Sequence, residues 1–175
     1  LCDNHCGARR SRNAVYSRVG NFKMKINVVA IGKIKEDFLK NGIAEYQKRM
    51  TRFADFNVIE LNEAPPSKSE SEQIAFECAE ILPKLKGVVI ATDIDGKQLS
   101  SVELSRFIDE KAVGGESEFT FVIGGSYGLD KKIKDMAALR LSFSKMTFPH
   151  QLFRLMLCEQ IYRALTISNR LPYHK

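Results

Sequence analysis

The 175-residue sequence contains no apolar run of about 18 residues, which is the length that a membrane-spanning helix requires. Its first 23 residues are rich in arginine but include no apolar stretch of the kind that secretory signals carry. Cys78 and Cys158 fall in apolar helical segments, where small core residues of a reduced protein are common. These absences argue against a membrane span and against secretion, and we predict a cytoplasmic protein.

Metal-site and common nucleotide-binding patterns are also missing. The three histidines are too scattered to form a metal site, and none has a spacing to Cys78 or Cys158 that indicates a catalytic thiol. The glycine segment GGSYG at residues 124–128 lacks the GxGxxG spacing of dinucleotide-binding proteins, and no lysine follows it as in a Walker motif. We therefore expect no metal, and these two nucleotide classes are disfavoured.

The apolar content of 44% suits one globular domain with a full core. Residues 1–23 show no apolar periodicity, whereas a clean strand pattern begins at Met24. We expect residues 1–23 to be a leader outside the fold, such as an upstream extension or a basic transit peptide, and residues 24–175 to form a single domain.

The basic excess of the expected domain lies in its final third. Residues 24–129 carry 13 basic and 17 acidic side chains, whereas residues 130–175 carry nine basic and three acidic ones. This distribution suits a phosphate-rich partner that approaches from one side, although a solvated charged face has the same composition.

Five short apolar runs alternate with helical patterns along the chain. Strands are expected at residues 25–31, 56–61, 88–92, 119–123 and 139–146. Helices are expected at residues 36–53, at 74–85 with a break at Pro83, after a capping box of Ser100 and Glu103, at 130–138 behind an Asp130 cap, and at 151–167. This alternation predicts an α/β fold with a mostly parallel sheet of five or six strands and helices on both faces, with ligands bound beyond the carboxyl ends of the strands.

Two segments at expected strand ends are candidates for chemistry. The glycines of GGSYG permit a tight turn and close approach of the backbone to a ligand, although a purely structural turn is at least as common. The segment FSKMTFPH at residues 143–150 offers backbone amides and carbonyls beside apolar side chains, which suits an adenine ring. A strand end turned by proline is the alternative for this segment.

Six motifs follow one another from residue 24 to residue 175: MKINVVAIGKIKE, ATDIDGK, FVIGGSYG, LSFSKMTFPHQLFR, EQIYRA and PYHK. Together they resemble the bacterial SPOUT-class methyltransferases that methylate N3 of a pseudouridine in 23S ribosomal RNA. The resemblance covers residues 24–175 without a large gap, and residues 1–23 have no counterpart in it.

The resemblance implies a C-terminal trefoil knot that binds S-adenosylmethionine, without a metal. The positions that match the family's cofactor site are Thr92, Gly124, Phe143, Ser144, Lys145, Met146, Thr147 and Phe148. Thr92 departs from the pattern, because relatives commonly carry leucine there. A backbone contact from this position would be unaffected, whereas a side-chain contact to the adenosine would be weakened.

Methylation of an imide N3–H requires that its proton leave, so a base or a group that stabilises the anion is needed. The candidate catalytic residues are Arg154, Arg163, Tyr173 and His174. His174 is the expected titrating group, Tyr173 is suited to orient or stack on the target base, and the arginines are suited to phosphate or developing negative charge.

Simpler interpretations of the same residues stay open. Glu159 lies one helical turn before Arg163, which predicts an ordinary ion pair equally well. Pro172 is compatible with a frayed C-terminus. For His150, a structural or RNA-contacting role is expected rather than acid–base chemistry.

The resemblance also implies a homodimer, with the last helix at the interface and the partner completing the active site. Phe153, Leu157 and Ile161 give this helix apolar residues on more than one side, which fits a dimer but also fits burial within one chain. The expected substrate is ribosomal RNA in an assembled ribosome or large subunit.

Three alternative functions stay open at this point. The first is a SPOUT methyltransferase that acts on another RNA, such as tRNA or a ribose 2′-hydroxyl. The second is a nucleotide-binding or RNA-binding module without catalysis. The third, a flavodoxin-like or Rossmann oxidoreductase, shares the alternating pattern but lacks a convincing phosphate fingerprint.

Overall fold

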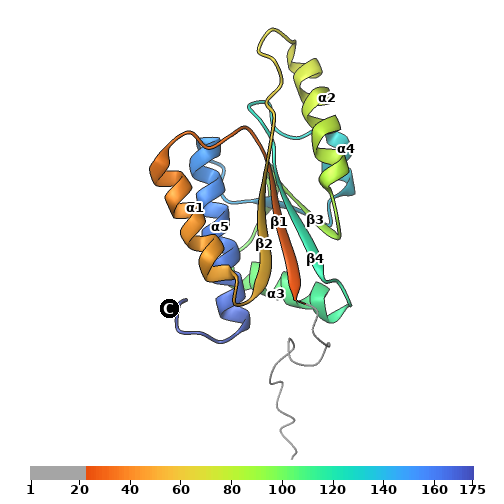
Figure 1. Cartoon of the computed structure of the whole chain (residues 1–175). Helices are drawn as coiled ribbons and strands as arrows, with labels where there is room; N and C mark the ends of the chain where they lie inside the picture. Colours follow the sequence, from red (N-terminus) through yellow and green to blue (C-terminus); the bar gives the residue numbers. More distant parts are fainter. Residues whose placement is uncertain (1–22) are drawn as a thin grey trace, which may run out of the picture.

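The computed structural model describes residues 23–175, which form an α/β fold around a five-stranded sheet (Figure 1). The strands are β1 (Met24–Ile31), β2 (Ala54–Leu61), β3 (Val88–Gln98), β4 (Glu118–Ile123) and β5 (Leu139–Ser142). Their spatial order is β2-β1-β4-β3-β5, and each neighbouring pair is parallel. The predicted fold class is confirmed, and the expected leader at residues 1–23 lies, except for Lys23, outside the described residues.

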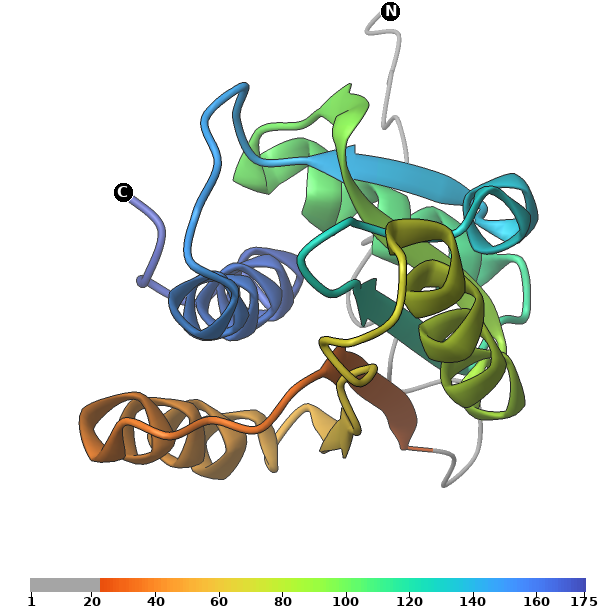
Figure 2. The ribbon, with the colours of Figure 1, turned by 90° about the horizontal axis from the view of Figure 1, so that it is seen from above.

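Helices cover both faces of the sheet. The helices described in residues 23–175 are α1 (Asp37–Met50), α2 (Glu70–Ile81), the short 3₁₀ helix η2 (Leu82–Lys84), α3 (Ser101–Val113), α4 (Lys131–Met136) and α5 (His150–Ser168). Viewed from above, α1 and α5 lie on one side of the sheet and α2 and α4 lie on the other (Figure 2). None of these helices is long and apolar enough to cross a membrane.

The strands are nearly continuous apolar runs because both of their faces are buried. In β1, Ile26 and Val28 belong to the core under α1, α3 and α5, whereas Val29 and Ile31 belong to the core under α2 and α4. Full burial of side chains of this size contributes about 1.5–3 kcal/mol each relative to exposure. The two cores fix the register of the sheet, since a shift by one residue would exchange their side chains.

The predicted helix signals are present at three helix ends. Ser100 Oγ accepts a hydrogen bond from the Glu103 backbone N–H, and the Glu103 carboxylate accepts one from the Ser100 N–H, at 3.2 and 2.7 Å. Asp130 accepts a bond from the Lys132 N–H at 2.7 Å and caps α4. Helix α2 ends at Ile81, and Pro83 lies in the following 3₁₀ turn.

Two strand ends differ from the expectation. Strand β5 ends at Ser142 rather than at residue 146, because Ser142 Oγ donates to the Ser144 carbonyl and Ser144 Oγ accepts from the Met146 N–H, in place of a ladder. Strand β3 extends from Val88 to Gln98 rather than to residue 92, with a register shift between Thr92 and Lys97. Residues 93–96 therefore bulge out of the sheet beside β5.

Helix α5 packs on the sheet through Leu157, Ile161 and Leu165, which are buried in the core of the chain, whereas Leu152 is 39% exposed. The burial of Leu157 and Ile161 is thus explained within one chain, and these two residues give no support to a dimer interface. Phe153, the other residue of this helix that was considered for a dimer interface, is partly buried.

The two cysteines of the described domain are buried free thiols, as predicted. Burial raises the pKa of the Cys158 thiol to about 12. Across residues 23–175, no cluster of three or more histidine, cysteine, aspartate or glutamate side chains is arranged to hold a metal ion. The trefoil knot stays a prediction, because strand order and pairing do not define how loops thread.

Candidate functional site

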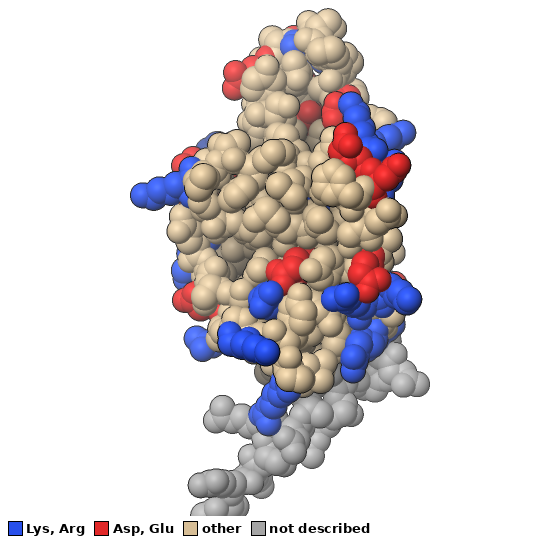
Figure 3. Space-filling model, turned by 90° about the vertical axis from the view of Figure 1, so that its left-hand side faces the viewer, with Lys and Arg blue, Asp and Glu red and all other residues tan. Residues whose placement is uncertain are grey.

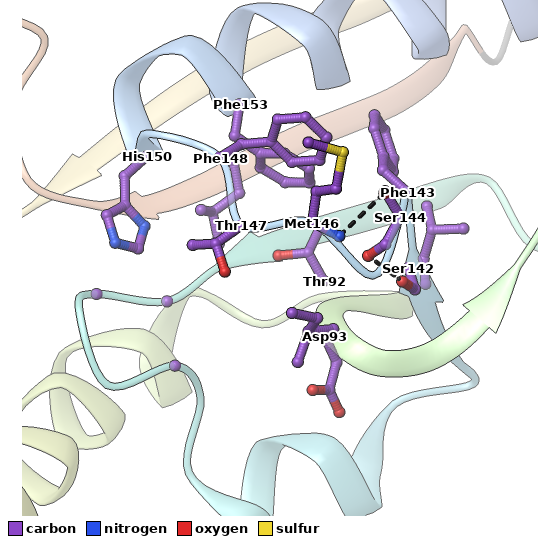
Figure 4. A pocket seen from close by; sticks show the side chains of 16 residues that line it. Thr92, Asp93, Ser142, Phe143, Ser144, Met146, Thr147, Phe148, His150 and Phe153 are labelled. Atoms are coloured by element: carbon purple, nitrogen blue, oxygen red, sulfur yellow. Dashed lines mark hydrogen bonds between the residues drawn. The ribbon is translucent and has the colours of Figure 1, made fainter.

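A cavity of about 140 Å³ lies beside the bulge of β3, beyond the carboxyl ends of the neighbouring parts of β4 and β5 (Figure 4). Seven of the eight predicted cofactor-binding residues line it: Thr92, Gly124, Phe143, Ser144, Met146, Thr147 and Phe148. The eighth, Lys145, is exposed and is not part of the lining. The structure therefore brings the bulge of β3, the turn after β4 and the loop after β5 together around one space, at the edge where open parallel sheets bind ligands.

The side chain of Thr92 is satisfied within the sheet. Its Oγ1 donates a hydrogen bond to the carbonyl of Val122 in the adjacent strand β4, at 2.8 Å. A hydroxyl at the end of β3 therefore brings no unpaired polar group to the cavity, in spite of the departure from leucine.

The glycine turn at residues 124–128 is compact because its own backbone folds against itself. The Gly128 N–H donates to the Gly125 carbonyl at 3.0 Å, and Gly128 has a φ of 79°. A Cβ atom on Gly124 would lie 2.7 Å from the backbone carbonyl group of Gly128. Glycine is thus required at these positions by close backbone approach and by a left-handed backbone conformation.

Glu77, in α2, holds this turn from behind and was not anticipated from the sequence. It is 7% exposed, and its carboxylate accepts hydrogen bonds from the backbones of Ala64 and Gly125. Burial raises the pKa of Glu77, and these two hydrogen bonds oppose that rise. The carboxylate therefore joins the loop after β2 to the turn after β4. The sequence did carry one sign of this buried role, because Glu77 precedes Cys78 on the inward side of a predicted helix.

An aromatic group closes one side of the cavity. The ring of Phe153 lies 4.8 Å from that of Phe143 and 6.1 Å from that of Phe148, measured between centroids. These rings come from the loop after β5 and from the first turns of α5, and His150 lies apart from them at the other end of the pocket (Figure 4). The aromatic wall provides the apolar surface on which a flat heterocycle packs.

Asp93 is a second buried acid that the sequence did not single out. Its carboxylate lies 2.6 Å from Arg140 Nη2 and 3.3 Å from Lys134 Nζ. Burial alone would raise the pKa of Asp93, but hydrogen bonds from Arg140 and Lys134 hold it below its ordinary value. Asp93 lines the cavity, and its ion pair with Arg140 joins the bulge of β3 to the adjacent strand β5.

The tail residues Tyr173 and His174 pack against α5. The Tyr173 hydroxyl donates to Glu159 Oε1 at 3.1 Å, and the Tyr173 ring packs edge-on against Tyr162, 4.9 Å between centroids. Arg163 lies over the Tyr173 ring, binds Glu159 and approaches His174 Nδ1 at 3.5 Å. The predicted ion pair between Arg163 and Glu159 is confirmed, and the frayed-tail alternative is wrong.

Arg154 lies apart from the other three candidate catalytic residues. It is 1% exposed and donates to Glu60 Oε1 at 2.7 Å and to the carbonyls of Ile31 and Gly32 at 3.1 and 3.0 Å. Arg163 follows Arg154 by nine positions, or about 14 Å of helix. Arg154 therefore binds the ends of β1 and β2, whereas the group of Arg163, Tyr173 and His174 lies toward the other end of α5.

The fold is that of an α/β protein whose parallel sheet carries a cavity between a glycine turn and an aromatic wall, at the edge of the sheet where such proteins bind ligands. The comparison with known families is more specific. Residues 24–174 match the family described as "Predicted SPOUT methyltransferase", and the chain belongs to this family.

Two curated relatives have the same name, "Ribosomal RNA large subunit methyltransferase H". The protein from Streptococcus uberis is 51% identical over 159 residues, and the one from Streptococcus pneumoniae strain CGSP14 is 49% identical over 159 residues. Each alignment covers 87% of this chain and 100% of the relative.

Solved structures with a similar arrangement are more distant. A probable methylase family protein from Haemophilus influenzae has a TM-score of 0.49 and 15% identity, over 87% of this chain and 71% of its own. The SpoU methyltransferase AviRb from Streptomyces viridochromogenes, in complex with AdoMet, has a TM-score of 0.43 and 10% identity, over 85% of this chain and 60% of its own.

Proposed function

We propose that this protein transfers the methyl group of S-adenosylmethionine to N3 of a pseudouridine in 23S ribosomal RNA. One observation carries the proposal: residues far apart in the sequence, which the family resemblance assigns to the cofactor, line one cavity at the ends of β3, β4 and β5. The name of the Streptococcus relatives supports ribosomal RNA as the substrate. A ribosomal substrate implies that the protein acts in the cytoplasm.

The residues of the cavity fit this cofactor. Gly124, Gly125 and Gly128 line the cavity with backbone alone, which allows a ligand to lie directly against the main chain of the turn. Phe143 and Phe148 would pack on the adenosine, and the backbone of the loop at residues 143–148 would bind the adenine edge. When bound, S-adenosylmethionine supplies an activated methyl group on a sulfonium sulfur, and the protein holds donor and acceptor in line.

The chemistry at the acceptor requires proton removal. The bound cofactor would supply a methyl group to N3 and leave as S-adenosylhomocysteine, and the N3 proton that the methyl group replaces must go to a group of the protein. The N3 proton passes to the His174 imidazole, whose unprotonated ring nitrogen acts as the general base. Arg163 stabilises the negative charge that develops on the base, and Tyr173 keeps Arg163 in place through their ring contact.

These tail residues serve the cavity of a second copy of the chain. Within one chain, Arg163 follows Phe153 of the cavity wall by ten residues, or about 15 Å of helix. Two α5 helices packed antiparallel would place the tail of one chain beside the first turn of the other. The side of the molecule where α1 and α5 lie shows a broad uncharged area, as an interface requires (Figure 3).

Hybrid dimers test this arrangement. A chain without residues 173–175 is expected to bind S-adenosylmethionine but not to methylate, and Gly124→Ala is expected to lose cofactor binding. A 1:1 mixture should recover about a quarter of wild-type activity, because half of randomly mixed dimers are hybrids with one complete site each. A mixture as inactive as its components, or a monomeric active species in sedimentation, would contradict the composite site.

Mass spectrometry of ribosomal RNA tests the function itself. Ribosomes that lack the modification are incubated with the protein and labelled S-adenosylmethionine, and the expected result is one labelled methyl group on N3 of a pseudouridine in 23S rRNA. Label on tRNA or on a ribose hydroxyl would support the alternative of another RNA substrate. Absence of S-adenosylmethionine binding in calorimetry would support a module without catalysis.

A further inference from the structure

A second and larger cavity, of about 600 Å³, adjoins the cofactor cavity and has no role in the function derived so far. It lies between the end of β1, the loop after β2, helix α2, the glycine turn and the start of α5. The two cavities share Gly125 and His150. Its volume is within the range of about 300–1,000 Å³ that is typical of small-molecule sites.

The charges around this cavity favour a nucleobase over a phosphate. Lys33 and Arg154 contribute positive charge, and Glu63 and Glu77 contribute negative charge. Because two basic and two acidic side chains share these walls, they leave no net positive charge to attract a phosphate or another acid. Arg154 and Glu77 are already bonded to Glu60 and to the backbone, whereas Lys33 and Glu63 are exposed and offer the donor and the acceptor that the edge of a uracil-type base requires.

The glycine turn contributes different residues to each cavity. Gly124, Gly125 and Gly128 line the cofactor cavity, whereas Ser126 and Tyr127 line only the larger one. The Tyr127 side chain is 49% exposed, although it is a large aromatic group on a tightly constrained turn. Aromatic side chains presented in this way are the usual surfaces on which unpaired RNA bases stack.

We infer that the larger cavity holds the RNA base that receives the methyl group, with Tyr127 stacked on its face. This inference rests on the proposed function and adds to it the location of the acceptor base. A base in this cavity would lie beside the cofactor, because Gly125 and His150 belong to both walls. The tail of the second copy would then approach the base from the side of α5.

Substitution of Tyr127 tests the inference. Stacking on one aromatic side chain contributes about 1–3 kcal/mol, so Tyr127→Ala should raise the KM for ribosomes by about 5- to 150-fold. The dissociation constant of S-adenosylmethionine should stay within about twofold of the wild-type value, because Tyr127 is not part of the cofactor cavity. Tyr127→Phe keeps the ring, so its KM for ribosomes should stay close to the wild-type value.

Two further variants make the result specific. Ser126→Phe places a bulky group in the larger cavity. It should reduce the rate of methylation at least tenfold and leave the affinity for S-adenosylmethionine unchanged. The control is Met136→Ala, which removes a similarly exposed apolar side chain (55%) from α4, outside both cavities, and should behave as wild type.

The outcomes separate this inference from the proposed function. Wild-type kinetics in both Tyr127→Ala and Ser126→Phe would overturn the assignment of the cavity while leaving methylation intact. The inference would also be overturned if Tyr127→Ala raised the dissociation constant of S-adenosylmethionine by the same factor as the KM for ribosomes. Tyr127 would then belong to the cofactor site. Failure of the wild-type protein to methylate ribosomes would instead reject the proposed function.

Discussion

The contact between Gly125 and Glu77 makes a quantitative prediction for Gly125→Ala. The added methyl group would lie 2.5 and 2.6 Å from the two carboxylate oxygens of Glu77, closer than real Cβ contacts come. Glu77 is buried and bound to two backbone groups, so it cannot move away without breaking those bonds. Overpacking of this kind costs about 1–3 kcal/mol, which corresponds to a fall in Tm of about 2–12 °C for a chain of this size.

Thermal unfolding and calorimetric titration with S-adenosylmethionine measure the two expected effects. Cofactor affinity should fall together with stability, because displacement of the turn also moves Gly124 in the cofactor cavity. Gly115→Ala is the control for a loss of stability away from the site, since Gly115 has a φ of 98° and a Cβ there would meet no atom within 4 Å. This control should lose about 1–2 kcal/mol and keep cofactor affinity.

A double-mutant cycle tests the cause. In a Glu77→Ala background the clash is gone, so the added methyl group should cost at least about 0.5 kcal/mol less than it does in the wild type. Equal costs in the two backgrounds would refute the explanation, because the methyl group would then be destabilising for a reason unrelated to the carboxylate.

Two further predictions concern the buried charges. Arg154→Met should lower the free energy of unfolding by about 3–5 kcal/mol in urea titrations, because Glu60 and two backbone carbonyls lose their donor; a loss below about 1 kcal/mol would contradict this. Asp93→Asn should destabilise the protein at pH 7, where the depressed pKa of Asp93 contributes stability. That contribution is present above the ordinary value of 3.8 and disappears as the pH falls through the folded-state pKa, so the unfolding temperatures of the two proteins should converge as the pH is lowered below 3.8. A difference that stays constant as the pH falls below 3.8 would show that the ion pairs with Arg140 and Lys134 are not responsible.

The sheet was predictable because its determinants are local in the sequence. Apolar runs such as residues 119–123 occur wherever both faces of a strand are covered, and Ser100 with Glu103 marks a helix start by chemistry within four residues. The positions that line the cofactor cavity came instead from whole motifs compared with a family. Apolar periodicity alone predicted only the edge of the sheet at which a ligand site would lie, and not the residues that line it.

The features that escaped prediction depend on contacts between distant segments. Glu77 and Arg154 look like ordinary surface residues of amphipathic helices until the loops after β1, β2 and β4 are placed around them. The apolar alternation continues beyond Ser142, yet the strand ends there, because side-chain hydrogen bonds of Ser142 and Ser144 replace the ladder. Periodicity contains no information about such competition.

The attachment of α5 has a mechanical consequence for ligand entry. The segment at residues 143–149 begins at β5, on one edge of the sheet, and ends at a helix that Arg154 ties to β1 and to β2 on the opposite edge. It is thus a strap fastened at both ends across the width of the molecule. Admission of a ligand beneath it requires torsional changes inside the strap itself, while the helix stays anchored.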